Sequence, residues 1–240
     1  MSSRLVAENL EKSFHGHRVV DGVSLSVEQW EVVSLLGPNG AGKTTVFKLM
    51  LGLLAPDRGA VSFDGPLDGL PLHVRARRGL GYLPQGASVF RGLTARDNIL
   101  AVLEALGRPS PAATADALLE RFGLEKLAAR RAGALSGGER RRLEFARALA
   151  SSPRLLLVDE PFAGVDPLAA KEISAAIADL ARGGVGVLLT DHTVREALAA
   201  SDRVYIIADG RIVVHGTPSE VVRSDLARRL YLGEGFVEPA

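Results

Sequence analysis

The 240-residue sequence contains no cysteine, and aromatic residues make up only 5% of it. Without cysteine there can be no disulfide scaffold, no thiol nucleophile and no zinc or iron–sulfur site with cysteine ligands. An excess of charge of either sign is also missing, because 29 Lys and Arg stand against 28 Asp and Glu and leave a formal net charge of +1. No overall basic field therefore points to nucleic acid.

Long hydrophobic runs are missing too. No apolar stretch reaches the roughly 18 residues that span a bilayer, and residues 1–10 lack the apolar centre of a signal peptide. We therefore expect a soluble, cytoplasmic chain. Its mean hydropathy of +0.15 is nevertheless high. An alanine-rich core would explain this value, and so would an apolar face covered by a partner.

The sequence alternates between strand-like and helix-like segments. Apolar runs of strand length lie at 31–36, 155–158, 185–190 and 203–207, and each of the first three is followed by a helical pattern. The last run is followed by a tight turn at Asp209-Gly210 into a further strand at 211–215, a hairpin signal, and then by a terminal helix at 218–230. This alternation predicts an α/β fold with a mostly parallel sheet. Alternating segments at 4–10 and 23–27 predict a smaller antiparallel β subdomain. We expect one domain over 1–240, with a core at 1–87 and 152–220, an inserted helical subdomain at 88–151 and a C-terminal helix and tail at 221–240.

A glycine-rich loop stands between the strand at 31–36 and the helix expected at 43–54. Its sequence fits the pattern G-x-x-x-x-G-K-[ST] and consists of Gly37, Pro38, Asn39, Gly40, Ala41, Gly42, Lys43 and Thr44. Glycines let successive backbone N–H groups face one anion, and the following helix adds its dipole. We expect Lys43 to reach the β- and γ-phosphates, Thr44 to bind Mg²⁺ and Thr45 to lie near the α-phosphate.

Two carboxylates end the apolar run at 155–158. They are Asp159 and Glu160. Ligands of parallel sheets bind at the carboxyl ends of the strands, so these acids should face the bound phosphates. Asp159 would then hold Mg²⁺, directly or through water, and Glu160 would polarise the attacking water as general base.

Three further features complete a recognisable set. Gln85 follows a short strand, Ser136, Gly137 and Gly138 begin a helix, and His192 follows another strand. In this order, phosphate loop, glutamine, Ser-Gly-Gly, Asp-Glu and histidine resemble the ATP-binding cassette (ABC) family over nearly the whole chain. The resemblance implies a P-loop NTPase core of the RecA-like kind, ATP and Mg²⁺ as ligands, and ATP hydrolysis.

The resemblance also implies a homodimer that encloses two ATP molecules. Each ATP would lie between one phosphate loop and Ser136, Gly137 and Gly138 of the other copy. A serine N-cap followed by bare glycines makes that helix start a second anion site. A single copy of the chain has no γ-phosphate that could bind at this second anion site.

Individual roles follow from the same resemblance. His192 would contact the γ-phosphate and position Glu160 and the attacking water. Gln85 would sense Mg²⁺ and this water and connect them to the helical subdomain. Phe14 stands where the family has an aromatic ring that stacks on adenine; the alternative is a core aromatic. Trp30 departs from the family, which usually has glycine there, so either the turn is rebuilt or the glycine is not essential.

Finer cues at 82–91, 160–167, 190–196 and 231–236 resemble the ATPase subunits of lipopolysaccharide exporters, which work as homodimers with two membrane subunits at the cytoplasmic face of the inner membrane. Branched-chain amino acid importer ATPases are the alternative, since their cassettes are similar in the same segments. We expect Phe90 and Arg91 to contact a short helix of the membrane subunit. The alternative is that Phe90 packs inside the helical subdomain.

Soluble ABC ATPases of DNA repair or translation are a second alternative. Repair types place a long coiled coil between phosphate loop and signature, and no sustained heptads lie between Lys43 and Ser136 here. Translation types carry two cassettes in one chain. The arginine clusters at 75–78 and 140–142 could touch nucleic acid, but we expect them to be solvated or paired with local acids, with no nucleic-acid partner.

Overall fold

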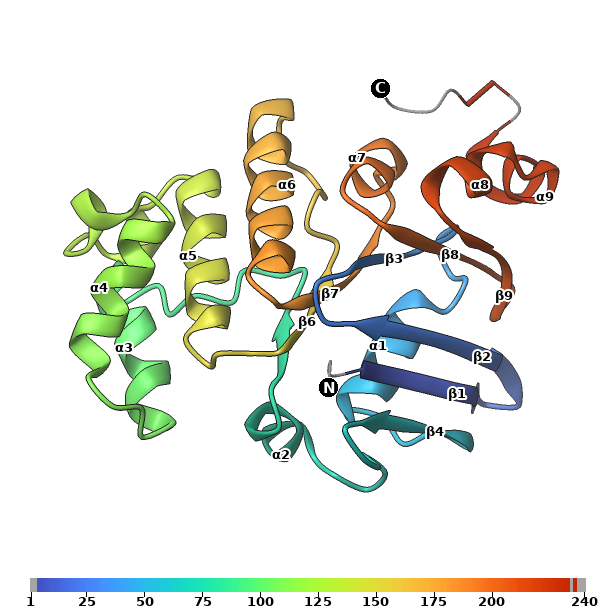
Figure 1. Cartoon of the computed structure of the whole chain (residues 1–240), viewed down its shortest axis with the longest axis horizontal. Helices are drawn as coiled ribbons and strands as arrows, with labels where there is room; N and C mark the ends of the chain where they lie inside the picture. Colours follow the sequence, from blue (N-terminus) through green and yellow to red (C-terminus); the bar gives the residue numbers. More distant parts are fainter. Residues whose placement is uncertain (1–3, 234, 237–240) are drawn as a thin grey trace.

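A six-stranded sheet forms the centre of the computed structural model, which describes residues 4–233, 235 and 236. Its strand order is β5-β6-β7-β3-β8-β9 (Figure 1). The first five strands are parallel, and β9 pairs antiparallel with β8. The bounds are β3 Val32–Leu36, β5 Leu80–Leu83, β6 Leu155–Asp159, β7 Gly186–Asp191, β8 Arg203–Ala208 and β9 Arg211–Gly216. Every residue of β3, β6 and β7 is buried, which explains their continuous apolar runs.

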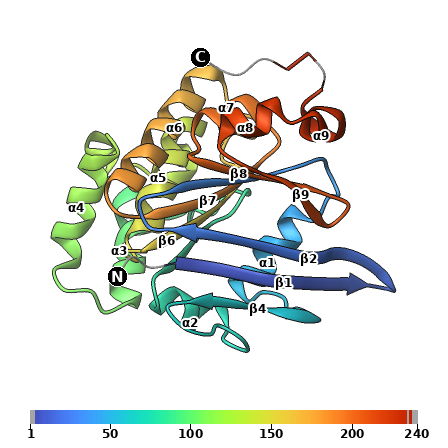
Figure 2. The ribbon, with the colours of Figure 1, turned by 45° about the vertical axis from the view of Figure 1, so that its right-hand side comes forward.

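A second, three-stranded antiparallel sheet lies beside the first, with order β2-β1-β4 (Figure 2). It consists of β1 Arg4–Phe14, β2 His17–Glu28 and β4 Arg58–Phe63. One core cluster joins this sheet to helix α1 (Lys43–Leu51) and to one side of the parallel sheet, with Phe47 and Phe63 among its largest buried side chains. This packing fixes the start of α1, where the glycine-rich loop lies.

Helices cover the remaining surfaces. Helices α3 (Ala95–Ala105), α4 (Pro111–Arg121) and α5 (Gly137–Leu149) gather at the left of Figure 1, and α6 (Pro167–Arg182) lies between them and α7 (Val194–Ala199). A second core cluster runs from these helices to the parallel sheet without a break. The proposed boundaries at 87/88 and 151/152 therefore stay a prediction. Shorter elements are α2 Leu72–Arg77, η1 Glu125–Leu127 and η2 Ala132–Ala134, none of which the hydrophobic pattern predicts.

The C-terminal segment differs from the single helix expected over 218–230. It divides into α8 (Pro218–Arg223), α9 (Asp225–Ala227) and the π-helical turn η3 (Arg228–Leu232). The break comes at Ser224, which has an extended backbone and caps the next turn by accepting from the N–H of Ala227. Likewise α1 ends at Leu51 rather than at residue 54, because Gly52 adopts φ 73° and closes the helix.

The turn between β2 and β3 keeps a glycine-like backbone although it carries tryptophan. Trp30 has φ 69°, in the left-handed region that L side chains rarely adopt. Its ring is 63% exposed and covers the backbone of Gly184. The turn is therefore not rebuilt, and Trp30 holds a strained conformation.

No helix in the described part of the chain is long and apolar enough to cross a bilayer.

Candidate nucleotide-binding and catalytic site

The glycine-rich loop connects β3 to α1 at the carboxyl edge of the parallel sheet, and two of its glycines are required by contacts within the chain. A Cβ on Gly37 would lie 2.1 Å from the carbonyl oxygen of Ile207. A Cβ on Gly42, which adopts φ 107°, would lie 2.7 Å from the carbonyl oxygen of Val19. The loop is therefore fixed between β8 and β2 before any phosphate binds.

Lys43 begins α1 and turns back over this loop. Its Nζ donates to the carbonyl oxygen of Gly37 at 2.6 Å and to that of Pro38 at 3.0 Å. Burial lowers the pKa of Lys43, whereas the nearby carboxylates of Glu160, Asp159 and Asp191 act to raise it. The ammonium group of Lys43 is thus held beside the loop. A bound phosphate can replace the two carbonyl oxygens as its hydrogen-bond acceptor.

The two acids at the end of β6 lie as expected, at the same edge of the sheet. Asp159 is buried and accepts a hydrogen bond from Thr190 Oγ1 of β7 at 2.6 Å. The backbone N–H of Glu160 donates to the carbonyl oxygen of Thr190 at 2.9 Å. Glu160 has φ 47°, so the chain stores strain at the residue expected to be the general base.

Two side chains from separate loops, Gln85 and His192, meet at Glu160. Gln85 Nε2 donates to Glu160 Oε2 at 2.6 Å, and His192 Nδ1 lies 3.2 Å from the same oxygen. Gln85 follows β5, Glu160 follows β6 and His192 follows β7, three adjacent strands of the sheet. Gln85 thus donates to one carboxylate oxygen that also lies beside the His192 ring, and the other oxygen can accept a proton.

Asp191 is a positioning residue that the sequence analysis missed. Its side chain is fully buried, and Oδ1 accepts from the backbone N–H groups of His192 and Thr193 at 2.8 Å each. Oδ2 accepts from the N–H of Phe162 at 2.7 Å. Asp191 therefore joins the loop that carries His192 to the loop that follows Glu160. Its place directly before His192 at a strand end was the available signal.

Oxygen donors for a divalent cation are present at the same edge. Thr44 is exposed at the first turn of α1, and Asp159 is the last residue of β6. Hydroxyl and carboxylate oxygens are the ligands that Mg²⁺ prefers, usually completed by water and substrate phosphates. The part of the chain that is described contains no cluster of three or more His, Cys, Asp or Glu suited to a metal. The donor set fits a cation that arrives with a nucleotide.

Ser136 is the N-cap of α5, as expected. Its Oγ accepts from the N–H of Glu139, and the Glu139 carboxylate accepts from the N–H of Ser136 at 2.7 Å, which forms a capping box. A Cβ added to Gly137 or Gly138 would meet no atom of this chain within 4 Å. This helix start is open, and α5 lies apart from α1, with α6 between them in the view of Figure 1.

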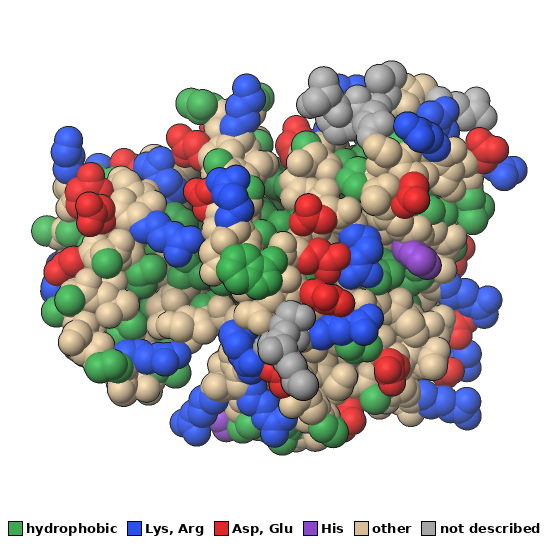
Figure 3. Space-filling model, viewed as in Figure 1, with side chains coloured by type: hydrophobic (Ala, Val, Ile, Leu, Met, Phe, Trp, Pro, Cys, Tyr) green, Lys and Arg blue, Asp and Glu red, His purple; other side chains and the backbone are tan. Residues whose placement is uncertain are grey.

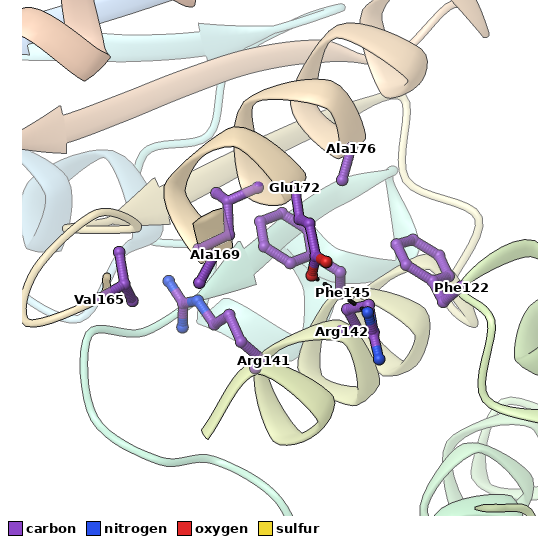
Figure 4. Close-up of a pocket in the computed structure, with 10 residues that line it drawn as sticks. Phe122, Arg141, Arg142, Phe145, Val165, Ala169, Glu172 and Ala176 are labelled. Atoms are coloured by element: carbon purple, nitrogen blue, oxygen red, sulfur yellow. Dashed lines mark hydrogen bonds and ion pairs between the residues drawn. The ribbon is translucent and has the colours of Figure 1, made fainter. Parts of the chain in front are cut away.

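Two of the following arginines pair with acids, one across to α6 and one within α5, rather than projecting as a basic face. Arg142 pairs with Glu172 of α6 at 3.1 Å, and Arg141 pairs with the buried Glu144 at 2.9 Å. Figure 4 shows Arg142 and Glu172 beside the ring of Phe145, in a hollow between the two helices. The expected pairing with local acids is confirmed for these two arginines.

Arg75, in the earlier cluster, is neither solvated nor paired with an acid, so that expectation was wrong. Its guanidinium is buried and donates to the carbonyl oxygens of Leu49 and Met50 at the end of α1, and to those of Leu67 and Leu70. Burial lowers its pKa, and the charge of Asp68 opposes this effect. Arg75 satisfies carbonyls that the helix leaves free.

Two exposed aromatic rings occupy the places expected for contacts outside the chain. Phe14 is 38% exposed at the end of β1, with Lys12 Nζ 5.9 Å from its ring, so it is not a core aromatic. Phe90 is 50% exposed, and the guanidinium of Arg147 lies 5.3 Å from its ring. The buried Asn98 holds the Phe90 backbone through both its N–H and its carbonyl oxygen.

The chain is similar to curated transport ATPases over almost its full length. A family model described as "ABC transporter" matches residues 20–163. The lipopolysaccharide export system ATP-binding protein LptB of Escherichia coli K12 is 50% identical over 236 residues, covering 97% of this chain and 98% of that protein. LptB of Acidithiobacillus ferridurans is 51% identical over 240 residues, covering 98% and 99%.

Solved structures agree with this. The ADP conformation of MJ1267, an ATP-binding cassette of an ABC transporter, has a TM-score of 0.87 at 29% identity and covers 98% of this chain and 100% of that one. A nucleotide-free ATP-binding cassette from an ABC transporter also has a TM-score of 0.87, at 28% identity. The expected α/β fold with an antiparallel β sheet is confirmed. The chain belongs to the ABC transporter family of ATP-binding cassettes.

Proposed function

We propose that this chain is the ATP-hydrolysing subunit of a transporter that exports lipopolysaccharide. Identity of 50% or more over nearly the full length of LptB proteins favours this over an amino acid importer or a soluble ABC ATPase. The observation that carries the catalytic part is the meeting of Gln85 and His192 on one oxygen of Glu160, beside the phosphate loop. Such an arrangement suits a carboxylate that acts on a reactant bound at that loop.

Each residue of the site has a definite task in hydrolysis. The loop at 37–45 binds the phosphates through its N–H groups and Lys43. Glu160 accepts the proton of the attacking water, while Gln85 and His192 fix its carboxylate in place. Thr44 and Asp159 would hold Mg²⁺, which supplies charge neutralisation of the phosphates when bound. Phe14 is exposed and would stack on adenine.

The open start of α5 supports a homodimer. Glycine costs stability in a helix relative to alanine, yet no contact within the chain requires Gly137 or Gly138. An outside group must approach this backbone closely, and a helix start with a serine cap suits an anion. We infer that this group is the γ-phosphate of an ATP held by the second copy. ABC ATPases work as dimers with transmembrane partners.

A groove beside Phe90 is suited to the membrane subunit. It has a volume of about 250 Å³ and lies between α2, β5, α3 and α5, with Tyr82, Val102 and Arg147 among the residues that line it. Figure 3 shows the surface hollowed between the helices at the left and the part of the molecule that contains α2. Phe90 and the neighbouring Arg91 would contact a short helix of the partner there. The protein would then work at the cytoplasmic face of the inner membrane.

Exchange of the proposed base tests the assignment. Glu160→Gln should keep ATP binding and lower turnover by at least ~100-fold, because general base catalysis contributes on that scale. Lys43→Ala, as a matched contrast, should weaken ATP binding itself. The measurements are steady-state ATPase rates and the affinity for a fluorescent ATP analogue. Near-parental turnover of Glu160→Gln would show that another group activates the water.

A further inference from the structure

Strand β7 carries a buried hydroxyl that the proposed mechanism does not use. Thr190 is fully buried near the end of this strand, after the apolar residues 187–189. Its backbone pairs with β3 on one side and β6 on the other, so the sheet itself does not require a hydroxyl here. A buried hydroxyl costs free energy unless it finds a hydrogen-bond partner. The partner of Thr190 therefore indicates what the hydroxyl does.

This partner is the carboxylate proposed to hold Mg²⁺. Thr190 lies directly opposite Asp159 in the parallel pair of β6 and β7, and its Oγ1 donates to Asp159 Oδ1 at 2.6 Å. Both residues are buried, where a hydrogen bond to a charged oxygen is short and strong. Among the described residues no second hydrogen bond to this carboxylate is formed, so Oδ2 stays available to a cation or to a water molecule bound to one.

Thr190 also contacts the neighbouring acid, Glu160. The backbone N–H of Glu160 donates to the carbonyl oxygen of Thr190 at 2.9 Å, and the same nitrogen lies 3.4 Å from Thr190 Oγ1. One residue of β7 therefore bonds to both acids that follow one another at the end of β6. Because threonine is branched at Cβ, its χ1 angle is stiff and the hydroxyl keeps its place between them.

We propose that Thr190 is a positioning residue for the Mg²⁺ site, whose hydroxyl fixes the rotation of the Asp159 carboxylate. Rotation about the Cβ–Cγ bond of an aspartate is only weakly restricted by its own side chain. The bond from Thr190 occupies Oδ1 and so holds Oδ2 ready for the cation before the nucleotide binds. Groups that hydrogen-bond to a metal ligand commonly decide its affinity in this way. The inference rests on the proposed function, in which Asp159 holds Mg²⁺.

Removal of the hydroxyl with the branched shape retained tests the proposal. With Thr190→Val, Mn²⁺ should bind about 10-fold more weakly to the complex of the chain with a non-hydrolysable ATP analogue, because a partner of a metal ligand is lost. Electron paramagnetic resonance of free Mn²⁺ gives this affinity, with the chain in excess over the analogue so that the nucleotide is bound. Affinity for the analogue in EDTA should stay at the parent's value, since the phosphate loop is unchanged.

Thr190→Ser is the matched control. It keeps the hydroxyl and loses only a methyl group, so its complex should bind Mn²⁺ as the parent's does, even if the variant is less stable. Weakened Mn²⁺ binding in Thr190→Ser as well as in Thr190→Val would assign the effect to packing and would overturn the proposal. Thr190→Ala deletes the same hydroxyl without placing a methyl group against the carboxylate, and it replaces Thr190→Val if that variant does not fold.

The remaining outcomes separate this inference from the proposed function. If the parent chain binds no ATP analogue, or if its complex binds Mn²⁺ no better than the analogue alone does, the proposed function itself fails. If the parent and Thr190→Val complexes bind Mn²⁺ equally, the hydroxyl does not position Asp159 and the inference is overturned. All variants are compared well below their melting temperatures, so that a loss of stability does not pass for a loss of affinity.

Discussion

At the scale of single residues, two of the eight non-glycine residues that adopt left-handed backbone in the described part of the chain are bulky or functional. One is Glu160, the proposed base, where strain accompanies function. The other is Trp30, in a turn at the start of β3, away from the carboxyl edge that carries the site. The strain at Trp30 is offset in part by contact of its ring with Gly184.

The strain at Trp30 can be measured with two substitutions that both remove the ring. Trp30→Gly relieves the backbone and Trp30→Ala does not, so we expect the glycine variant to be more stable than the alanine variant by about 1 kcal/mol. Urea unfolding of both variants and the parent gives this difference. Equal stability of the two would mean that residue 30 does not hold φ 69° in solution.

Asp191 is expected to matter for both stability and turnover. Asp191→Asn replaces an acceptor oxygen by an amide that faces N–H donors, so the free energy of unfolding should fall by about 1–3 kcal/mol. The loop that carries His192 would shift, and ATP hydrolysis should fall toward that of a His192→Ala control, which leaves stability near the parent's. A destabilised variant with full activity would show that Asp191 does not orient His192.

At the scale of elements, helix α5 serves the fold with its inner face and the proposed dimer with its first turn. Its inner face packs through Leu143 and Phe145 into the larger core cluster. Its first turn contributes no such packing and stays open at Gly137 and Gly138. A change confined to the first turn should therefore separate folding from dimer function.

Ser136→Arg makes that change. The monomer should fold and bind ATP, but a long side chain then stands where the partner's γ-phosphate must approach. Dimerisation in the presence of ATP and hydrolysis should fall together, measured by gel filtration with a Glu160→Gln background and by ATPase assay. Ser136→Thr retains the cap and serves as the control. Full activity of Ser136→Arg would place the second phosphate contact elsewhere.

At the scale of the whole molecule, the phosphate site and the groove beside Phe90 are joined by a short path. Gln85 contacts Glu160, and the N–H of Ser88, three residues later, donates to the buried Glu144 of α5 at 2.8 Å. Phe90 follows, held outward by Asn98. Movement at Glu160 can therefore reach the surface proposed for the membrane subunit.

Phe90→Ala tests this surface. Because the ring is half exposed, its loss should change the melting temperature little, whereas a core phenylalanine would cost about 3–5 kcal/mol. Pull-down of the membrane subunits should fall sharply. Leu226→Ala on α9, another exposed large side chain, should leave assembly intact. A large drop in melting temperature for Phe90→Ala would contradict the interface proposal.

Local sequence patterns were sufficient to predict the candidate site residues and most of the helices and strands. The glycine-rich loop, the acids after β6 and the capped start of α5 are local patterns, in which a few adjacent residues define both backbone and function. The alternation of strands and helices predicted the α/β fold, and the ordered set of motifs resembled the ABC family. Helix boundaries were predicted less closely. The end of α1 at Leu51, for example, is set by the backbone conformation of a single residue, Gly52.

The burial, exposure and partners of side chains that contact distant segments became visible only in the folded chain. Folding buried Arg75 on helix carbonyls and exposed Phe90. It also let Asp191 join the loop that carries His192 to the loop that follows Glu160. Hydrophobic periodicity cannot reveal such contacts, since each joins side chains that no local pattern relates. They arise because parallel strands bring their carboxyl ends to one edge, whatever their separation in sequence.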